Sequence, residues 1–282
     1  RHTSIGFSFI IFLAFAVSAT AQTRGDRETS EQKPVQTQTD PAVAAKPENK
    51  FQFMHGRISY RKKGPEGFER GREDWSLTHN RDGSRTLRTL SMTDDSKFVR
   101  DVTYTIDTDA RPLRAFVQLQ VDDQLVGSGY FQVTGDRMTI VTDGVDTGHT
   151  MQVIPVPKRF HVMTHALMAD GWPALAFEGK EPGTQTFPSY STSPSWDGTS
   201  GPLGYMTTQD LTLVGSEQVT VPAGKFQAQH YIIGDDADPL GASHIWVTGE
   251  HNILVKYDWP AFGMEYMLES LIVEPQTDLP KP

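Results

Sequence analysis

From Phe51 onward, apolar and polar residues alternate with a period of two, and this pattern constrains the fold more than any other feature. In residues 113–121 every odd position is apolar, and Phe116 alone interrupts the polar set at the even positions. Residues 98–106 and 263–272 alternate in the same way. Successive side chains of a β-strand point to opposite faces of the sheet. These segments therefore predict half-buried strands.

Residues that favour tight turns separate the apolar runs. They lie at Gly64-Pro65, Asp82-Gly83, Asp122-Asp123, Gly135-Asp136 and Ala223-Gly224. Strands so close in sequence leave no room for crossover helices, so the sheet is expected to be an antiparallel meander. About a dozen strands would leave costly open edges unless the sheet curls. We predict an all-β fold with one short helix, curled into a barrel or half-barrel.

The N-terminal residues resemble an export signal. The apolar run 5–17 spans thirteen residues, and the small residues Ala19 and Ala21 follow it. A membrane-spanning helix needs roughly 20 apolar residues, so this run indicates a signal peptide cleaved after Ala21 and a periplasmic or secreted protein. Residues 22–50 contain no aromatic residue and predict a disordered linker. Residues 51–282 are expected to form a single antiparallel β domain.

Composition excludes several classes of function. The 282-residue chain has no cysteine, which rules out disulfides, thiolate metal sites and a cysteine nucleophile. Its formal net charge of −9 gives no electrostatic reason to bind nucleic acid or anionic lipid. The sequence has no phosphate-binding glycine loop, no dinucleotide fingerprint and no Gly-x-Ser-x-Gly elbow, so we expect no cofactor and recognise no catalytic motif.

Residues 158–169 predict the one helix, because their apolar positions recur at helical spacing before Gly171. His161 and His165 lie four positions apart and would share a face, a spacing that can hold a metal. No acidic residue lies between them, so we expect partly exposed polar histidines and no metal site. Residues 183–204 are rich in Ser, Thr, Pro and Gly and predict a long loop, which either gates a cavity or packs into the barrel wall.

Several residues are candidates for a ligand site on the concave face. Glycines at 127 and 129 share strand parity with Phe131, which allows either close approach by a ligand or a bend that closes the sheet. Soft and aromatic side chains can line a pocket or fill a core. The candidate ligand-binding residues are Gly127, Gly129, Phe131, Trp196, Trp246 and Tyr266.

His230 and His244 are candidates for acid–base chemistry. Each shares strand parity with apolar neighbours, which predicts an inward orientation. Two inward histidines could act as general acid and base, or could be hydrogen-bonded parts of the core. The candidate catalytic residues are therefore His230, His244, His161 and His165.

The C-terminal region contains three short motifs, namely Val221-Pro222-Ala223-Gly224, Ile245-Trp246-Val247 and Leu254-Val255-Lys256. On these motifs, roughly residues 211–271 resemble a family of exported bacterial β-proteins with no assigned function. This resemblance implies a curved antiparallel sheet similar to periplasmic lipoprotein carriers and lipocalin-like folds. It transfers no catalytic residue.

The sequence favours an exported protein that binds an apolar or amphipathic small molecule, or a lipid, in the curve of its sheet. One alternative is a cofactor-independent hydrolase or lyase that uses histidines on a small aromatic or lipid-like substrate. The other is a structural envelope protein with a filled core.

Overall fold

The computed structural model describes residues 51–195, 198–235, 237 and 240–275, which belong to one compact unit. The first half of the sheet contains β1 (Gln52–Lys62), β2 (Phe68–His79), β3 (Arg85–Thr93), β4 (Phe98–Ile106), β5 (Pro112–Val121), β6 (Gln124–Thr134), β7 (Arg137–Gly144) and β8 (Gly148–Pro155). The second half contains β9 (His161–Met163), β10 (Gly183–Ser191), β11 (Tyr205–Val221), β12 (Gly224–Ile233), β13 (Ser243–Thr248), β14 (Ile253–Trp259) and β15 (Met264–Val273). Three short helical segments are α1 (Leu167–Asp170), η1 (Trp172–Ala176) and η2 (Pro260–Phe262).

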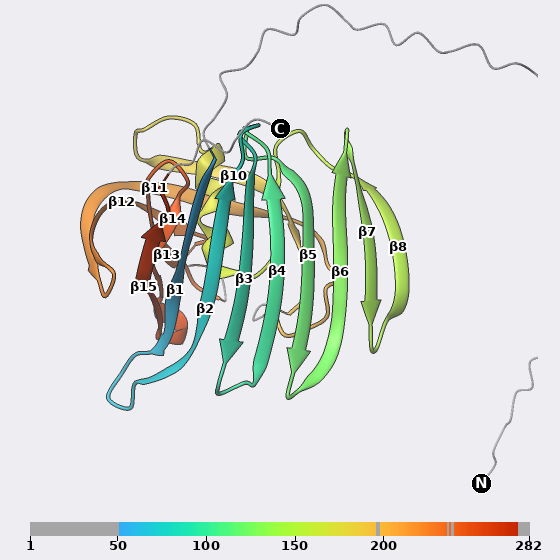
Figure 1. The fold of residues 1–282 in the computed structure, drawn as a ribbon, viewed down its shortest axis with the longest axis horizontal. Coiled ribbons are helices and arrows are strands. Elements are labelled where there is room, and N and C mark those ends of the chain that lie inside the picture. The colour runs from blue at the N-terminus through green and yellow to red at the C-terminus, as the bar shows by residue number, and fades with distance from the viewer. Residues whose placement is uncertain (1–50, 196–197, 236, 238–239, 276–282) are drawn as a thin grey trace, which may run out of the picture. The chain divides into compact units, whose positions relative to one another are not determined.

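The described strands form one curved, open sheet (Figure 1). Sequence neighbours pair from β1 to β8 and from β9 to β15, and β1 pairs with β15 to join the two halves. Every pairing is antiparallel except that of β9 with β10, which is parallel. The two ends of the sheet are β8 and β9. The predicted curled antiparallel meander is confirmed, in the form of an open sheet.

Turn residues set the strand reversals. Asp122 and Asp123 join β5 to β6 with φ values of 52° and 62°, which are the left-handed angles of a two-residue hairpin turn. Aspartate tolerates these angles better than most residues, because its short side chain can hydrogen-bond locally.

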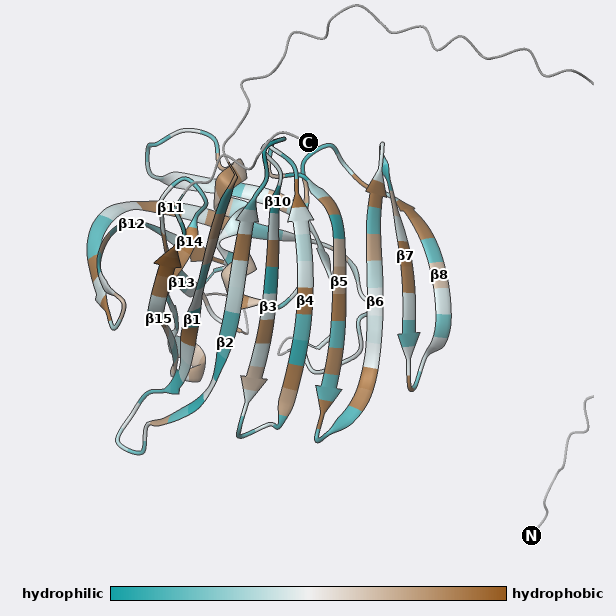
Figure 2. Ribbon diagram, viewed as in Figure 1, coloured by the Kyte–Doolittle hydropathy of each residue, from teal (hydrophilic) through white to brown (hydrophobic). Residues whose placement is uncertain are grey.

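Alternation along the strands gives the sheet a buried inner face and a more polar outer face. Hydrophobic and hydrophilic segments alternate along β2 to β6 in Figure 2. On the inner face, the ring of Phe131 lies 5.6 Å from that of Tyr190, and the ring of Tyr104 lies 5.2 Å from that of Trp172. Tyr190 and Trp172 belong to the second half of the chain. The core therefore forms where the segment between β8 and β11 packs against the first half-sheet.

Glu73 fixes this interior segment in place. The β2 carboxylate is fully buried and accepts hydrogen bonds from the backbone N–H groups of Leu167 and Met168, both at 2.9 Å. It also accepts one from Ser91 at 2.7 Å and one from Tyr60 at 3.2 Å. The first N–H groups of a helix lack intrahelical partners, so this carboxylate satisfies two of them in α1.

The predicted helix at 158–169 is wrong. Residues 161–163 form β9, His165 has a left-handed φ of 57°, and α1 begins only at Leu167. Phe160, Val162 and Ala166 are all buried, because the segment crosses the interior and is covered from several sides. Their spacing reflects burial on several sides. In a short apolar run, such burial cannot be distinguished from helical periodicity by sequence alone.

The predicted loop at 183–204 begins with a strand. Residues 183–191 form β10, which pairs with β11 along its length and with β9 at Ser189–Ser191. Pro188 lies just outside the part of β10 that pairs with β9, where its missing N–H removes no hydrogen bond to that strand. Within the described part of the chain, no helix is long and apolar enough to cross a bilayer.

Candidate functional site

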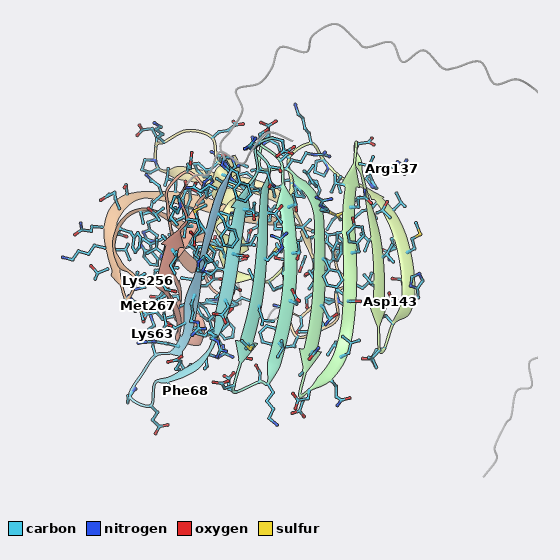
Figure 3. All side chains as sticks on the ribbon, viewed as in Figure 1. Lys63, Phe68, Arg137, Asp143, Lys256 and Met267 are labelled. Carbon is cyan, nitrogen blue, oxygen red and sulfur yellow. The ribbon has the colours of Figure 1, made fainter. Side chains whose placement is uncertain are left out.

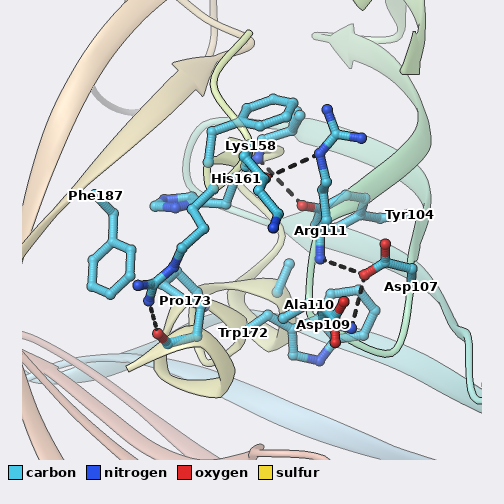
Figure 4. A pocket seen from close by; sticks show the side chains of 15 residues that line it. Tyr104, Asp107, Asp109, Ala110, Arg111, Lys158, His161, Trp172, Pro173 and Phe187 are labelled. Carbon is cyan, nitrogen blue, oxygen red and sulfur yellow. Dashed lines mark hydrogen bonds between the residues drawn. The ribbon is translucent and has the colours of Figure 1, made fainter. Parts of the chain in front are cut away.

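A pocket lies where the β4–β5 turn meets the segment before α1, and we call it the Trp172 pocket (Figure 4). Its apolar lining includes four aromatic side chains that are each at most 4% exposed, namely Tyr104, Phe160, Trp172 and Phe187. The remaining lining residues are Asp107, Asp109, Ala110, Arg111, Lys158, Arg159, His161, Val162, Ala169, Pro173 and Ala176. The pocket thus has an aromatic interior and charged residues from two neighbouring segments.

The size of the pocket limits what can enter it. Its volume is about 80 Å³. Pockets for drug-sized ligands measure roughly 300–1,000 Å³. A short apolar group fits the Trp172 pocket, whereas a complete lipid does not.

Trp172, which lines this pocket, has a buried indole N–H group without a partner among the described residues. The indole is 3% exposed, and its Nε1–H group has no hydrogen-bond partner among the described residues. Buried donors are almost always paired, because an unpaired one costs the free energy of its lost hydration. An acceptor oxygen on a bound molecule would satisfy this N–H group.

The basic side chains around the pocket differ in whether they have hydrogen-bond or ion-pair partners. Arg111 donates to the carbonyls of Lys158 and Gly135, at 3.0 and 2.5 Å, and Arg159 is paired with Glu178. The side chain of Lys158 is exposed and has no hydrogen-bond or ion-pair partner among the described residues. Lys158 is therefore the cation that is free to meet an anionic group.

Asp107 shapes the other side of the pocket. Its carboxylate accepts the backbone N–H groups of Asp109 and Arg111, both at 2.9 Å. These bonds close the β4–β5 turn, in which Ala110 has a left-handed φ of 60°. The pocket wall at this turn is held by hydrogen bonds from backbone N–H groups to the Asp107 carboxylate.

His161 is a neutral, buried side chain of the pocket. Its Nε2 lies 2.9 Å from Oε1 of Gln209 and 3.0 Å from the hydroxyl of Ser189. Burial lowers the pKa of His161 to about 4, and the Gln209 bond opposes this shift. His161 and His165 do not share a helical face, because His165 lies beyond β9 and its Nε2 contacts the Ser191 hydroxyl at 3.4 Å.

The glycines at 127 and 129 face the chain itself. A Cβ at Gly129 would lie 2.8 Å from Cβ of Pro202, and one at Gly127 would lie 3.0 Å from Cδ of the same proline. Phe131 is 1% exposed and packs in the core. The close approach is real, but Pro202 makes it at Gly129, and the Asp143 carbonyl oxygen and Pro202 make it at Gly127. Among the described residues, these three positions line no pocket.

His230 and His244 come together, but on the outer face. His230 Nε2 lies 2.9 Å from His244 Nδ1, and His230 Nδ1 lies 3.3 Å from Glu217. His230 and Trp246 are directly opposite in the β12–β13 ladder, and their rings stack 4.4 Å apart. The predicted inward orientation is wrong, because the neighbours of Trp246 in β13, Ile245 and Val247, occupy the inner face.

Trp246 is held by its neighbours on this outer face. Its indole N–H donates to Glu217 at 2.6 Å, and the Lys256 ammonium lies 5.2 Å from its ring centroid. The Lys256 side chain is labelled on β14 in Figure 3. A cation over an indole ring is attracted by the negative potential of that ring. The cluster lies apart from the residues that line the Trp172 pocket.

Tyr266 is buried, and Asp170 is half-buried. The ring of Tyr266 lies 4.9 Å from that of Tyr60 and 5.5 Å from that of Tyr257, and burial raises the pKa of Tyr266 to about 12. Burial, followed by the charge of Glu73, raises the pKa of Asp170 to about 8. Tyr266 is therefore a core residue. Trp196, the remaining predicted ligand contact, lies outside the described residues.

The aromatic lining of the Trp172 pocket is not evident as a site from the sequence. Phe160 falls within the helix expected at 158–169, Lys158 is the first residue of that range, and Trp172 lies beyond it. The Trp172-Pro173 pair after an apolar run is the sequence feature that could have indicated this pocket. The unpaired N–H group of Trp172 depends on tertiary packing and left no trace in the sequence.

Comparison with known protein families and with curated proteins gives no match. Among solved structures, the fold is similar to a β-barrel-like protein of the domain of unknown function DUF1849 from Brucella abortus. That likeness has a TM-score of 0.52 at 11% identity and covers 81% of this chain and 100% of the other. A DUF1089 family protein from Pseudomonas aeruginosa aligns with a TM-score of 0.41 at 9% identity, over 67% of this chain and 90% of the other. The first likeness shows a shared β-barrel-like fold.

Proposed function

We propose that this protein binds a small amphipathic molecule in the Trp172 pocket. The observation that carries the proposal is a pocket lined by aromatic rings, one of which, Trp172, has a buried indole N–H group without a partner among the described residues. The ligand places a short apolar group against Phe160 and Phe187. It places an acceptor oxygen, best a carboxylate, where Trp172 and Lys158 can reach it.

The volume of the pocket narrows the ligand class. About 80 Å³ accepts a single ring or a short alkyl chain. The remainder of a longer molecule would lie outside, over the exposed Lys158. The proposal keeps the amphipathic ligand expected from the sequence, and moves it from the concave face to the edge of the interior segment.

The histidine-based alternative has less support. His230 and His244 lie on the outer face, and His161 is engaged by Gln209 and Ser189. No observation at the Trp172 pocket favours a reaction over binding.

Isothermal titration with benzoate and hexanoate, and with the neutral benzyl alcohol and hexanol, tests the proposal. We expect the carboxylates to bind more tightly than the alcohols. The Trp172→Phe variant keeps an aromatic ring but removes the donor, and should lose about tenfold or more in carboxylate affinity, since hydrogen bonds to charged groups contribute about 1.5–3 kcal/mol. Lys158→Ala should lose less carboxylate affinity than Trp172→Phe, because exposed ion pairs contribute about 0.2–1 kcal/mol.

The matched control for Lys158→Ala is Lys180→Ala, which removes an exposed lysine that does not line the pocket. Its affinities should equal those of the wild type. Absence of carboxylate binding in the wild type, or unchanged affinity in Trp172→Phe, would contradict the proposal.

We also propose that the protein acts outside the cytoplasm, after removal of residues 1–21. The apolar run and the small residues at 19 and 21 support this location. N-terminal sequencing of the protein from its native cell should find Gln22 as the first residue.

A further inference from the structure

The β8 edge of the sheet is open and poorly protected. Residues 148–155 pair with β7 on one side and with no described strand on the other. This edge is the right-hand border of the sheet in Figure 1. The opposite end, β9, is only three residues long and packs against the interior. Open edges present unpaired backbone N–H and C=O groups that can pair with another strand.

The edge lacks the usual protection of full charges. Soluble proteins blunt open strands with lysine, inward charges, bulges or proline. Residues 148–155 contain no Asp, Glu, Lys or Arg, although the chain carries a net charge of −9. Arg137 and Asp143 lie at opposite parts of the neighbouring β7, as Figure 3 shows, and Asp143 is paired with His149 at 2.8 Å. Because β8 carries none of these charged residues, two copies that meet along β8 would experience little charge repulsion.

An apolar row on the outer face leads to this edge. Phe116 is opposite Tyr130, Tyr130 is opposite Val141, and Val141 is opposite Met151 in the strand ladders. Met151 is 66% exposed and Tyr130 is 40% exposed. The row therefore ends abruptly at an exposed methionine on an unpaired strand.

We propose that β8 pairs antiparallel with β8 of a second copy, with Met151 opposite Met151 at the two-fold axis. This register joins the two apolar rows into one. The residues that it places opposite each other are all uncharged, apart from His149. The paired segment runs from Gly148 to Ile154 and leaves Pro155, which has no N–H group to donate, outside the ladder. A register centred on Gln152 would bring Pro155 into the ladder.

The absence of cysteine makes the register directly testable. Opposed residues of antiparallel strands have Cα atoms about 4.5–5.5 Å apart, within the range that a disulfide bridges. In the proposed register, Met151→Cys places its two thiols opposite each other. Val153→Cys is the matched control on the same strand and face, because its two copies are separated by about 13 Å along the strand, too far for a disulfide.

Mild oxidation of each full-chain variant, read by non-reducing electrophoresis, is the first measurement. We expect Met151→Cys to form covalent dimer at least tenfold faster than Val153→Cys. Equal rates, or a faster reaction of Val153→Cys, would overturn the register.

Sedimentation velocity of the unmodified full chain is the second measurement. We expect dimer in the wild type and monomer in Met151→Lys, because that variant opposes two like charges at the two-fold axis. Val214→Lys introduces the same charge at an exposed position of β11, distant from the edge, and should remain dimeric. A monomeric wild type at all concentrations would overturn the proposal, and it would leave the Trp172 pocket proposal unaffected.

Discussion

At the scale of single residues, Glu73 is the clearest determinant of the interior. Four donors contact its buried carboxylate, two of them backbone N–H groups of α1. Burial raises the pKa of Glu73, while these hydrogen bonds oppose the rise. The residue links β2, β3 and the interior segment through one side chain.

We expect Glu73→Gln to destabilise the fold by about 1–3 kcal/mol, because the amide nitrogen of glutamine would face donors that need an acceptor. Amide exchange at Leu167 and Met168 should accelerate more than exchange in β4. Urea unfolding and hydrogen-exchange mass spectrometry measure the two effects. Glu69→Gln, an exposed change on the same strand, serves as the control.

A stability of Glu73→Gln equal to that of Glu69→Gln would show that the carboxylate does not anchor α1. The sequence did not predict this role. Glu73 lies between Arg72 and Asp74, where a run of charges is typical of a solvated strand face. Its burial follows from the interior segment that β2 meets in the folded state.

At the scale of elements, the strands could be predicted, whereas the interior segment could not. Residues 98–106 and 113–121 have one largely buried face and one more accessible face, so their sequence alternates in the way that the structure requires. Residues 160–177 have no such solvent-exposed face, and their contacts come from strands distant in sequence. The helix expected at 158–169 failed for this reason.

The packing of Pro202 on β6 gives a prediction at the same scale. A Cβ at Gly129 meets Pro202 at 2.8 Å and the Phe131 ring at 3.1 Å, so Gly129→Ala should cost about 1–3 kcal/mol through overpacking. Gly183→Ala is the matched control, since nothing lies within 4 Å of its Cβ position. Thermal or urea unfolding compares the two variants.

Equal stability of Gly129→Ala and Gly183→Ala would mean that Pro202 does not pack against β6. Loss of stability in Gly129→Ala alone would confirm that the glycine accommodates a segment of the chain. From the sequence, the glycine could be recognised as a site of close approach, but the approaching residue could not.

At the scale of the whole molecule, the half-buried Asp170 and the buried His161 both affect how stability depends on pH. The pKa of Asp170 is raised to about 8, so the folded state holds a proton that the unfolded state releases near pH 4. This group therefore lowers stability as pH rises towards 8. His161 has the opposite effect on stability, because its pKa is lowered to about 4 in the folded state. This effect operates only below the ordinary histidine pKa of about 6.5, where the unfolded state binds the proton.

Above pH 6.5, therefore, the Asp170 effect is no longer opposed by His161. We expect the free energy of unfolding to fall by about 2 kcal/mol between pH 6.5 and pH 8, since one proton changes it by about 1.4 kcal/mol per pH unit. Asp170→Asn should remove this decline. Asp123→Asn, an exposed change at a left-handed turn position, should retain it.

Urea unfolding at several pH values measures these profiles. Parallel profiles for the wild type and Asp170→Asn would contradict the raised pKa of Asp170. The curled all-β fold could be predicted from strand alternation and turn spacing, but the raised pKa of Asp170 could not, because its neighbours come from separate parts of the chain.

The central claim is that the Trp172 pocket binds the carboxylate of a small amphipathic molecule. The most direct measurement is the nitrogen–proton NMR spectrum of the tryptophan indoles during titration with benzoate, with the Trp172 signal assigned from its absence in Trp172→Phe. We expect a saturable downfield shift of the Trp172 indole proton, with the Trp246 indole unchanged. A saturable shift at Trp246 with none at Trp172, or no shift at either, would contradict it.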